Sequence, residues 1–169
     1  MELWDIYDNN RNHTGRTHVR GDPLTKGDYH IVVLVWIVNH FGHILLTKRH
    51  PDKHWPNMWE CTGGCVIAGE DSLSGAIREA KEEIGLLLDP SLGRLIKNYI
   101  GMDTIYDAWL FIEDVDLNHV RFQPGEITDA MFVNKALLQS MFDKNQIVPT
   151  LEFILELIET DRELNGLVK

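Results

Sequence analysis

The stretch from Gly64 to Leu86 reads GCVIAGEDSLSGAIREAKEEIGL, and it constrains the fold more than any other part of the chain. It carries Glu79, Glu82 and Glu83 at positions i, i+3 and i+4, so on a helix these carboxylates share one face at spacings of about 5–6 Å. Gly85 predicts the end of that helix, where the macrodipole is negative and further acids are unfavourable. The cluster therefore indicates a bound cation, and Mg²⁺ or Mn²⁺ prefers such oxygen ligands.

A solvated acidic helix face is the alternative interpretation of this stretch. In that case Arg78 and Lys81 would serve as intrahelical partners of the glutamates. This reading leaves Gly64 and Glu70 without a role, and it does not explain why the acids gather at the unfavourable end of the helix.

The composition is that of a soluble globular chain of one domain. The 169 residues are 44% hydrophobic and 25% charged, with a net charge of −10. The longest apolar stretch, Ile31 to Val38, is too short to span a bilayer, and no secretory or lipidation signal opens the sequence, so we expect a cytoplasmic protein without a membrane partner. The acidic balance disfavours a large nucleic-acid footprint, but it permits a small phosphorylated ligand.

The hydrophobic pattern predicts a mixed sheet between helices, which is an α/β fold. Residues 29–38 are typical of a strand buried on both faces, and residues 44–47 return as its hairpin partner after a turn. Asp71 or Ser72 is expected to cap the Gly64–Leu86 helix. Its core-facing stripe comprises Leu73, Ala76, Ile77, Ala80 and Ile84. The glutamate face should then look into a cleft beside the sheet.

Further elements are expected along the rest of the chain. The strands fall at residues 94–101, 106–113 and 130–133, and the helices at 134–142 and 149–160. The last helix is apolar on most sides, so it packs on the sheet or forms a homodimer face. Residues 1–28 predict a strand–turn–strand extension packed on the main domain, residues 29–169.

Basic and aromatic residues precede the Gly64–Leu86 stretch. Lys48, Arg49 and Lys53 are candidates to clamp a terminal phosphate, and an arginine would do so with two parallel hydrogen bonds. Trp55 lies in the same proline-bearing loop and is the best candidate to stack on a substrate ring.

The two cysteines are spaced neither as a disulfide framework nor as a zinc ribbon. Cys61 and Cys65 are expected to be buried free thiols, and a zinc site that uses His54 with them is the weaker alternative.

The spacing Gly64-(five residues)-Glu70-(seven residues)-Arg78-Glu79-Ala80-Lys81-Glu82-Glu83-Ile84-Gly85-Leu86 resembles the signature box of the Nudix family. The resemblance implies an α/β/α sandwich around a mixed sheet and a metal-dependent hydrolase of diphosphates. Further segments are similar to a branch related to isopentenyl-diphosphate isomerase. These segments are Asp5–Asp8, Thr14–Arg16, Arg20-Gly21, Tyr29-His30, Leu46–Arg49 and Trp55–Glu60.

The resemblance also implies roles for individual residues. The carbonyl of Gly64 and the carboxylates of Glu79, Glu82 and Glu83 would hold the metal. Arg78 would orient the glutamates, reaching Glu82 at i+4, with Glu70 in a supporting part.

A further acid is implied by the stretch from Gly125 to Val133. It nominates Glu126 as an additional ligand or as the general base, although an ordinary loop acid is the alternative. Either Glu79 or Glu126 could accept the proton of an attacking water.

Two other functions remain open at this stage. An isomerase of the related branch needs a catalytic cysteine and a metal-binding histidine before the box, and the corresponding positions here, Gly63 and Cys65, retain neither. A binding module that senses a nucleotide without hydrolysing it would not require three like charges held together at electrostatic cost.

Overall fold

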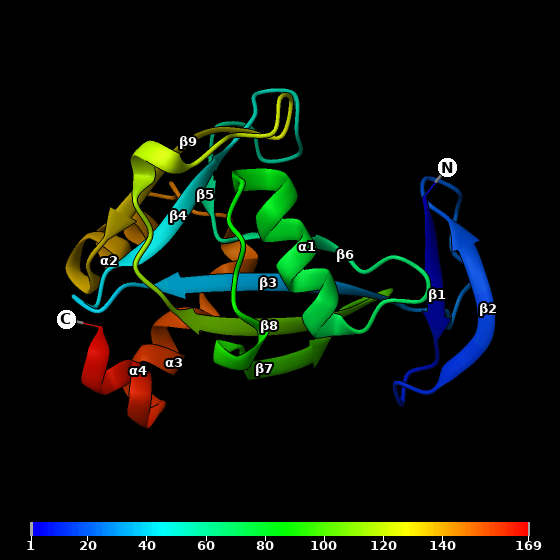
Figure 1. Cartoon of the computed structure of the whole chain (residues 1–169). Coiled ribbons are helices and arrows are strands. Elements are labelled where there is room, and N and C mark those ends of the chain that lie inside the picture. The colour runs from blue at the N-terminus through cyan, green and yellow to red at the C-terminus, as the bar shows by residue number, and fades with distance from the viewer. Residues whose placement is uncertain (1, 169) are drawn as a thin grey trace.

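A computed structural model of the chain describes residues 2–168 as a mixed seven-stranded sheet with helices on both faces (Figure 1). The strands run in the order β5-β4-β3-β8-β7, with β6 paired to β3 and β9 paired to β4. Their bounds are β3 His30–Val38, β4 Ile44–Arg49, β5 Trp59–Glu60, β6 Thr62–Cys65, β7 Arg94–Ile100, β8 Thr104–Ile112 and β9 Ile127–Val133. β3 and β8 are parallel, whereas their other neighbours are antiparallel. The predicted α/β fold with a mixed central sheet is confirmed.

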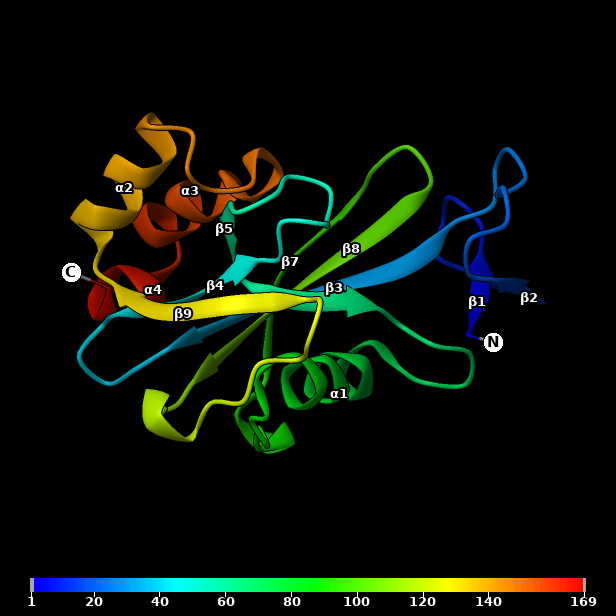
Figure 2. The same ribbon diagram turned by 90° about the horizontal axis from the view of Figure 1, so that it is seen from above.

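β3 is the central strand, and both of its faces are buried. Val33, Val35 and Ile37 pack against α1 (Ser72–Ile84) on one face, whereas Trp36 and Val38 join the core under the C-terminal helices on the other. This alternation follows from the two-residue period of a strand. Figure 2 shows the resulting layers, with α1 on one side of the sheet and α2 (Lys135–Asp143) and α3 (Phe153–Thr160) on the other.

α1 spans Ser72–Ile84 and begins and ends as the sequence predicts. The Asp71 carboxylate caps it by accepting a hydrogen bond from the Ser74 amide at 2.7 Å. Gly85 ends it in the left-handed conformation, with φ of 73°. Ala76, Ala80 and Ile84 are fully buried, so the face that carries the glutamates is turned away from the core.

The C-terminal part differs from the single predicted helix. The 3-10 turn η3 (Pro149–Leu151) is followed by α3 (Phe153–Thr160), and Asp161 then caps a separate α4 (Arg162–Leu167) by accepting from the Glu163 and Leu164 amides. Ile154 and Ile158 of α3 are buried in the core beside α2 (Lys135–Asp143). α3 thus packs on the sheet, the first of the two predicted alternatives.

The predicted hairpin of residues 29–38 and 44–47 forms only at its turn. β3 and β4 pair at Val38 and Ile44, after which β4 diverges to pair with β9. β6 takes the vacated edge of β3, and Gly63 permits this because a Cβ there would lie 2.1 Å from the Val33 carbonyl oxygen. The glycines of β6 therefore place the start of the Gly64–Leu86 stretch inside the sheet.

The N-terminal residues form a hairpin with its own two-stranded sheet, β1 (Leu3–Tyr7) and β2 (His13–Val19). Figure 1 shows it at one end of the main sheet, beside the loop between β6 and α1. The Ala68 amide donates to the Leu3 carbonyl at 2.8 Å, and the Gly69 amide donates to Asp5 at 2.8 Å. These contacts fix the hairpin next to the Gly64–Leu86 stretch.

A helix able to cross a membrane would have to be both long and apolar, and none of the helices within residues 2–168 meets that description.

Candidate active site

A polar cleft of about 380 Å³ lies over the glutamate face of α1. Its walls come from β6, from the loop that follows β4, from the loop before β9, and from the N-terminal hairpin. These segments are distant in sequence, so the cleft exists only in the folded chain. It is the natural place for a charged ligand because ionisable side chains line most of it.

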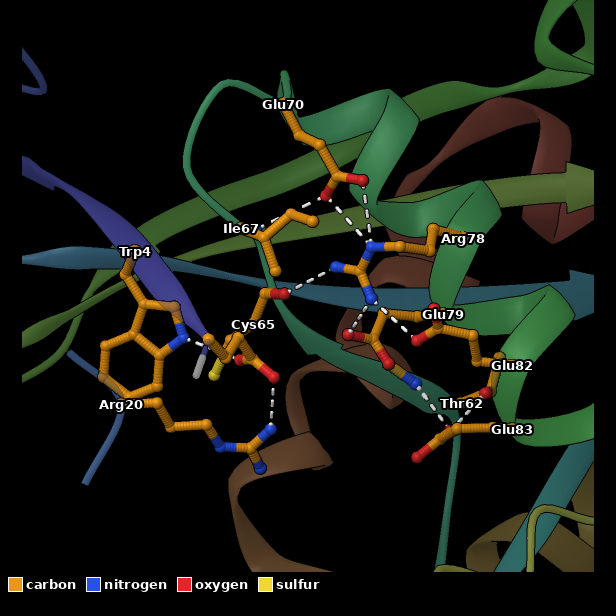
Figure 3. A network of polar contacts seen from close by, with 12 residues as sticks. Trp4, Arg20, Thr62, Cys65, Ile67, Glu70, Arg78, Glu79, Glu82 and Glu83 are labelled. Carbon is orange, nitrogen blue, oxygen red and sulfur yellow. Dashed lines mark hydrogen bonds and ion pairs between the residues drawn. The ribbon is translucent and has the colours of Figure 1, made fainter. Parts of the chain in front are cut away.

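Arg78 holds one side of the cleft together (Figure 3). Its Nε donates to Glu70 at 2.9 Å, and its Nη1 donates to Glu79 at 2.8 Å and to Glu82 at 2.9 Å. Its Nη2 donates to the Cys65 carbonyl oxygen at 2.8 Å. The contact with Glu82 is the one that the i, i+4 spacing predicts, and the four contacts together fix the orientation of the carboxylates.

Glu79 lies directly against the backbone of β6. A Cβ built on Gly64 would fall 2.5 Å from the Glu79 carboxyl carbon, so only glycine lets the carboxylate approach this segment. Burial raises the pKa of Glu79 to about 7, and the charges of Glu83 and Glu82 add to the rise while Arg78 opposes it. The effect of burial on the Glu79 carboxylate therefore outweighs the stabilising effect of Arg78.

Glu83 is the most deeply placed acid of the cluster, at 4% exposure. Its Oε2 accepts hydrogen bonds from the Thr62 hydroxyl and, at 3.1 Å, from the Gly63 amide. Burial nevertheless raises its pKa to about 7. Neutral donors from β6 thus hold the carboxylate at the unfavourable end of the helix.

A loop lysine stands among the acids of the opposite wall. The Lys53 ammonium lies 2.5 Å from a Glu126 oxygen and 3.8 Å from a Glu83 oxygen. Glu126 comes from the loop before β9, so the fold brings this predicted acid to the α1 cluster. The lysine marks a position where positive charge is stabilised by two carboxylates.

The donor set fits a hard divalent cation. Glu79, Glu82, Glu83 and Glu126 offer carboxylate oxygens, which Mg²⁺ and Mn²⁺ prefer. Burial raises the pKa of Glu79 and of Glu83 to about 7, so a bound cation would stabilise the charged form of both carboxylates. Within residues 2–168, no three acidic, histidine or cysteine side chains already converge as ligands. Hydrogen bonds and ion pairs with Arg78, Thr62 and Lys53 already use part of the capacity of these carboxylates.

The predicted phosphate-binding residues divide between two faces of β4. Arg49 lines the cleft, although its Nη1 is 2.5 Å from Glu60 and its Nε donates to the His54 carbonyl at 2.7 Å. Lys48 lies outside the cleft, with its ammonium 5.8 Å from the centre of the Trp59 ring. Consecutive strand residues point to opposite faces, so the structure does not bring Lys48 to the site.

Trp55 lines a second cavity of about 220 Å³ that shares Arg49, Gly63 and Gly64 with the cleft. The residue adopts a left-handed backbone, with φ of 54°, which is uncommon for a side chain of this size. The second cavity is bordered mainly by apolar side chains of β3 and of the segment before α3. The predicted aromatic candidate therefore lies beside the charged cleft rather than inside it.

The two cysteines are free thiols, but they differ in burial. Cys61 is buried, as predicted, whereas Cys65 is only half-buried and lines the cleft. Burial raises the pKa of Cys65 to about 11, and that of Cys61 also lies well above its ordinary value. Because the described residues hold no converging metal-ligand group, the zinc alternative with His54 gains no support.

Sequence reasoning missed the roles of four residues in or beside the cleft. Arg20 and Glu2 enter from the N-terminal hairpin, and Gln123 enters from the loop before β9. Thr62 was missed as the partner of Glu83. No local pattern marks these residues, because each acquires its place through a contact between distant segments.

Comparison with known proteins gives one consistent family. Residues 28–151 match the family model of the NUDIX domain. A Listeria monocytogenes protein described as the uncharacterized Nudix hydrolase lmo0368 is 38% identical over 151 residues, which cover 88% of this chain and 89% of that protein. Nudix hydrolase 3 of Arabidopsis thaliana is 31% identical over 135 residues, covering 78% of this chain and 16% of that much longer protein.

Solved structures share the fold. DR0079 from Deinococcus radiodurans superposes with a TM-score of 0.71 at 21% identity and covers 87% of this chain and 92% of its own. A bifunctional NMN adenylyltransferase/ADP ribose pyrophosphatase from Francisella tularensis, solved with AMP and a Mn ion, gives a TM-score of 0.65 at 18% identity. It covers 83% of this chain and 42% of its own.

Proposed function

This chain belongs to the Nudix family and is a hydrolase that acts on phosphorus anhydrides. From this premise we propose that it cleaves the diphosphate bond of a nucleoside diphosphate derivative or a similar phosphorylated small molecule, with Mg²⁺ or Mn²⁺ as cofactor. The observation that carries the proposal is the cleft that Glu79, Glu83 and Glu126 line together with Gly64. We also propose that the chain belongs to the branch that resembles isopentenyl-diphosphate isomerase, and the similar segments within its first 60 residues support this proposal.

In this proposal the residues of α1 and β6 mainly bind the metal. Glu79, Glu82, Glu83 and the Gly64 carbonyl would hold the metal, which supplies charge neutralisation on the diphosphate and a bound water of lowered pKa. Arg78 keeps Glu79 and Glu82 in place through hydrogen bonds of 2.8 and 2.9 Å. Four of its five N–H donors are used within the protein, so its main part in the proposal is to position the ligands.

Glu126 is the better candidate for the general base. Glu79 adjoins the Gly64 backbone and accepts a hydrogen bond from Arg78, an arrangement that suits a ligand. Glu126 is 37% exposed at its side chain, and its charged contact is with Lys53. It can therefore face an attacking water and accept its proton, while Lys53 contacts a phosphate oxygen.

The substrate would lie across the two cavities. The diphosphate occupies the charged cleft, and the group attached to it enters the adjoining cavity bordered by Trp55, where a planar ring would stack. Arg49 lies at the junction but is bound to Glu60, so it shapes the passage. A small ligand of this kind also suits a chain with a net charge of −10, which disfavours a large nucleic acid.

The cysteines argue against isomerase chemistry. An isomerase of the related branch would need a cysteine and a histidine before the box, and Gly63 and Cys65 stand at those positions instead. Burial raises the pKa of Cys65, the thiol in the cleft, to about 11, and Cys61 is buried away from it. A hydrolase would need a bound metal and carboxylates to hold it, and the cleft provides the carboxylates.

A phosphate-release assay tests the proposal. We expect turnover of at least one compound among nucleoside diphosphates and triphosphates, ADP-ribose and sugar nucleotides with Mg²⁺ or Mn²⁺, and none in EDTA. Glu79→Gln should abolish it, whereas Glu156→Gln, at an exposed position of α3, should not. Binding without turnover across this panel would favour a sensing module, and efficient conversion of isopentenyl diphosphate to its dimethylallyl isomer would favour the isomerase.

A further inference from the structure

One cation of the cleft comes from outside the family-matched range. The Nudix match begins at residue 28, yet Arg20, which follows β2 of the N-terminal hairpin, lines the same cleft as the glutamates of α1. Figure 3 shows its side chain running below Cys65, with the guanidinium toward the part of the cleft where Glu83 lies. The hairpin is thus part of the cleft wall.

The other cations of the cleft are already engaged. Arg78 makes hydrogen bonds to three carboxylates and one carbonyl, and Arg49 is bound to Glu60 and to the loop backbone. Lys53 lies between two acids. Within residues 2–168, the Arg20 guanidinium makes a single hydrogen bond, from Nη1 to Glu2 at 2.9 Å. A guanidinium has five N–H donors in a planar fork, so a pair of them remains available to a ligand.

A series of contacts links Arg20 to the main sheet. The Arg20 amide donates to the Glu2 carbonyl at 3.0 Å, and Trp4 Nε1 donates to the Glu2 carboxylate at 2.9 Å. The Trp4 ring in turn stacks on His30, at the start of β3, with centroids 4.1 Å apart and planes 11° from parallel. Because Trp4 and His30 are both buried, the position of Glu2, and through it that of Arg20, is tied to the main sheet.

We propose that Arg20 is a substrate-binding residue that grips a phosphate group of the substrate on the hairpin side of the cleft. A guanidinium binds phosphate oxygens through two parallel, charge-assisted hydrogen bonds. The inference rests on the proposed diphosphate hydrolase and adds the N-terminal hairpin to its site. The ligand class is an oxyanion that extends beyond the carboxylate cluster. One phosphate of a diphosphate would then contact Arg20 while the other lies at the carboxylate cluster.

Binding of inorganic pyrophosphate, measured by calorimetry at fixed Mg²⁺, tests this residue separately from turnover. Arg20→Ala should weaken binding roughly 10-fold or more, and Arg20→Lys should fall between the two because it keeps the charge without the fork. Arg16→Ala is the matched control: Arg16 lies on β2, is 56% exposed against 57% for Arg20, and pairs with Asp28 outside the cleft. We expect it to bind as the wild type does.

Equal affinity for the wild type and Arg20→Ala would overturn the proposal, and so would equal losses in Arg20→Ala and Arg16→Ala, which would reflect only the overall charge. Thermal melting of each variant verifies that it is folded. If the chain proves not to hydrolyse any diphosphate while Arg20→Ala still weakens pyrophosphate binding, the proposed function fails and the anion site stands. If hydrolysis is found and Arg20→Ala binds normally, only the present inference fails.

Discussion

Arg78→Ala is the substitution whose effect can best be worked out from the contacts. The side chain joins Glu70, Glu79 and Glu82 to the carbonyl of Cys65. Removing it leaves two carboxylates, Glu70 and Glu79, that are 20% and 13% exposed and have lost their cation. The fold should therefore lose stability in addition to any loss of activity.

The size of that loss follows from burial. Removing one partner of a fully buried ion pair costs about 3–5 kcal/mol, whereas an exposed pair contributes about 0–1 kcal/mol. Glu82 is 50% exposed and belongs to the second class. Since the other two pairs are mostly but not wholly buried, we expect Arg78→Ala to lower the free energy of unfolding by about 2–3 kcal/mol. For a chain of this length the melting temperature should fall by about 4–12 °C.

Thermal and urea unfolding in EDTA measure this change without a contribution from metal. Lys81→Ala is the control, because Lys81 lies exposed on the same helix and makes no ion pair with residues 2–168. It should change stability by less than about 0.5 kcal/mol. Turnover of Arg78→Ala should be reduced less than that of Glu79→Gln, through misplaced carboxylates. A melting temperature equal to that of Lys81→Ala would refute the view that Arg78 organises this side of the cleft.

Three further substitutions give separate tests. Glu83→Gln keeps an acceptor for the Thr62 hydroxyl, so the free energy of unfolding in EDTA should change by less than about 1 kcal/mol while turnover falls by orders of magnitude. Near-full turnover of this variant would show that Glu83 has only a structural role. Gly64→Ala places a Cβ 2.5 Å from the Glu79 carboxyl, so Mn²⁺ affinity and turnover should both fall roughly 10-fold or more while circular dichroism shows an intact fold. Unchanged Mn²⁺ affinity would contradict the proposed role of Gly64 and Glu79 as metal ligands. Two hydrogen bonds from Arg94 lower the pKa of Asp161 to about 2. Their stabilising effect is present above the ordinary pKa of about 3.9 and is lost as pH falls toward 2, so stability curves of the wild type and Asp161→Asn should converge over that range; a constant difference would contradict the linkage.

The main sheet and α1 could be predicted because their signals are local. The apolar run of β3 reports burial on both faces, and the Asp71 cap, the apolar stripe and Gly85 mark the limits of α1. The pairing of β4 could not be predicted, since its hairpin with β3 stops after one residue pair. That outcome depends on β6, whose glycines allow it to reach β3 from a later part of the chain.

The acids of the candidate site were predictable for a similar reason, because helical spacing alone puts three of them on one face. The prediction of which basic side chains bind phosphate was less successful. Lys48 and Arg49 are adjacent in sequence, and a strand sends adjacent side chains to opposite faces, so both could not serve one cleft. The end of the expected last helix at Thr160 is confirmed, but the separate α4 that follows was missed, although Asp161 carries a recognisable cap signal. Arg20 stood in one of the segments similar to the related branch, but its place in the cleft could not be predicted, because it depends on the docking of the hairpin.

The electrostatics of the cleft explain how a cluster of acids at a helix end remains folded before a cation binds. The helix dipole and mutual repulsion both disfavour Glu79 and Glu83 there. The structure offsets this cost with Arg78 on one side, with the Thr62 hydroxyl and the Gly63 amide below, and with Lys53 on the loop. Of these partners, only Lys53 lies on a loop whose side chain can move away without loss of core contacts. If a divalent cation were held by Glu83, Lys53 is therefore the partner that we would expect to move, and its ammonium could then contact a phosphate of the substrate.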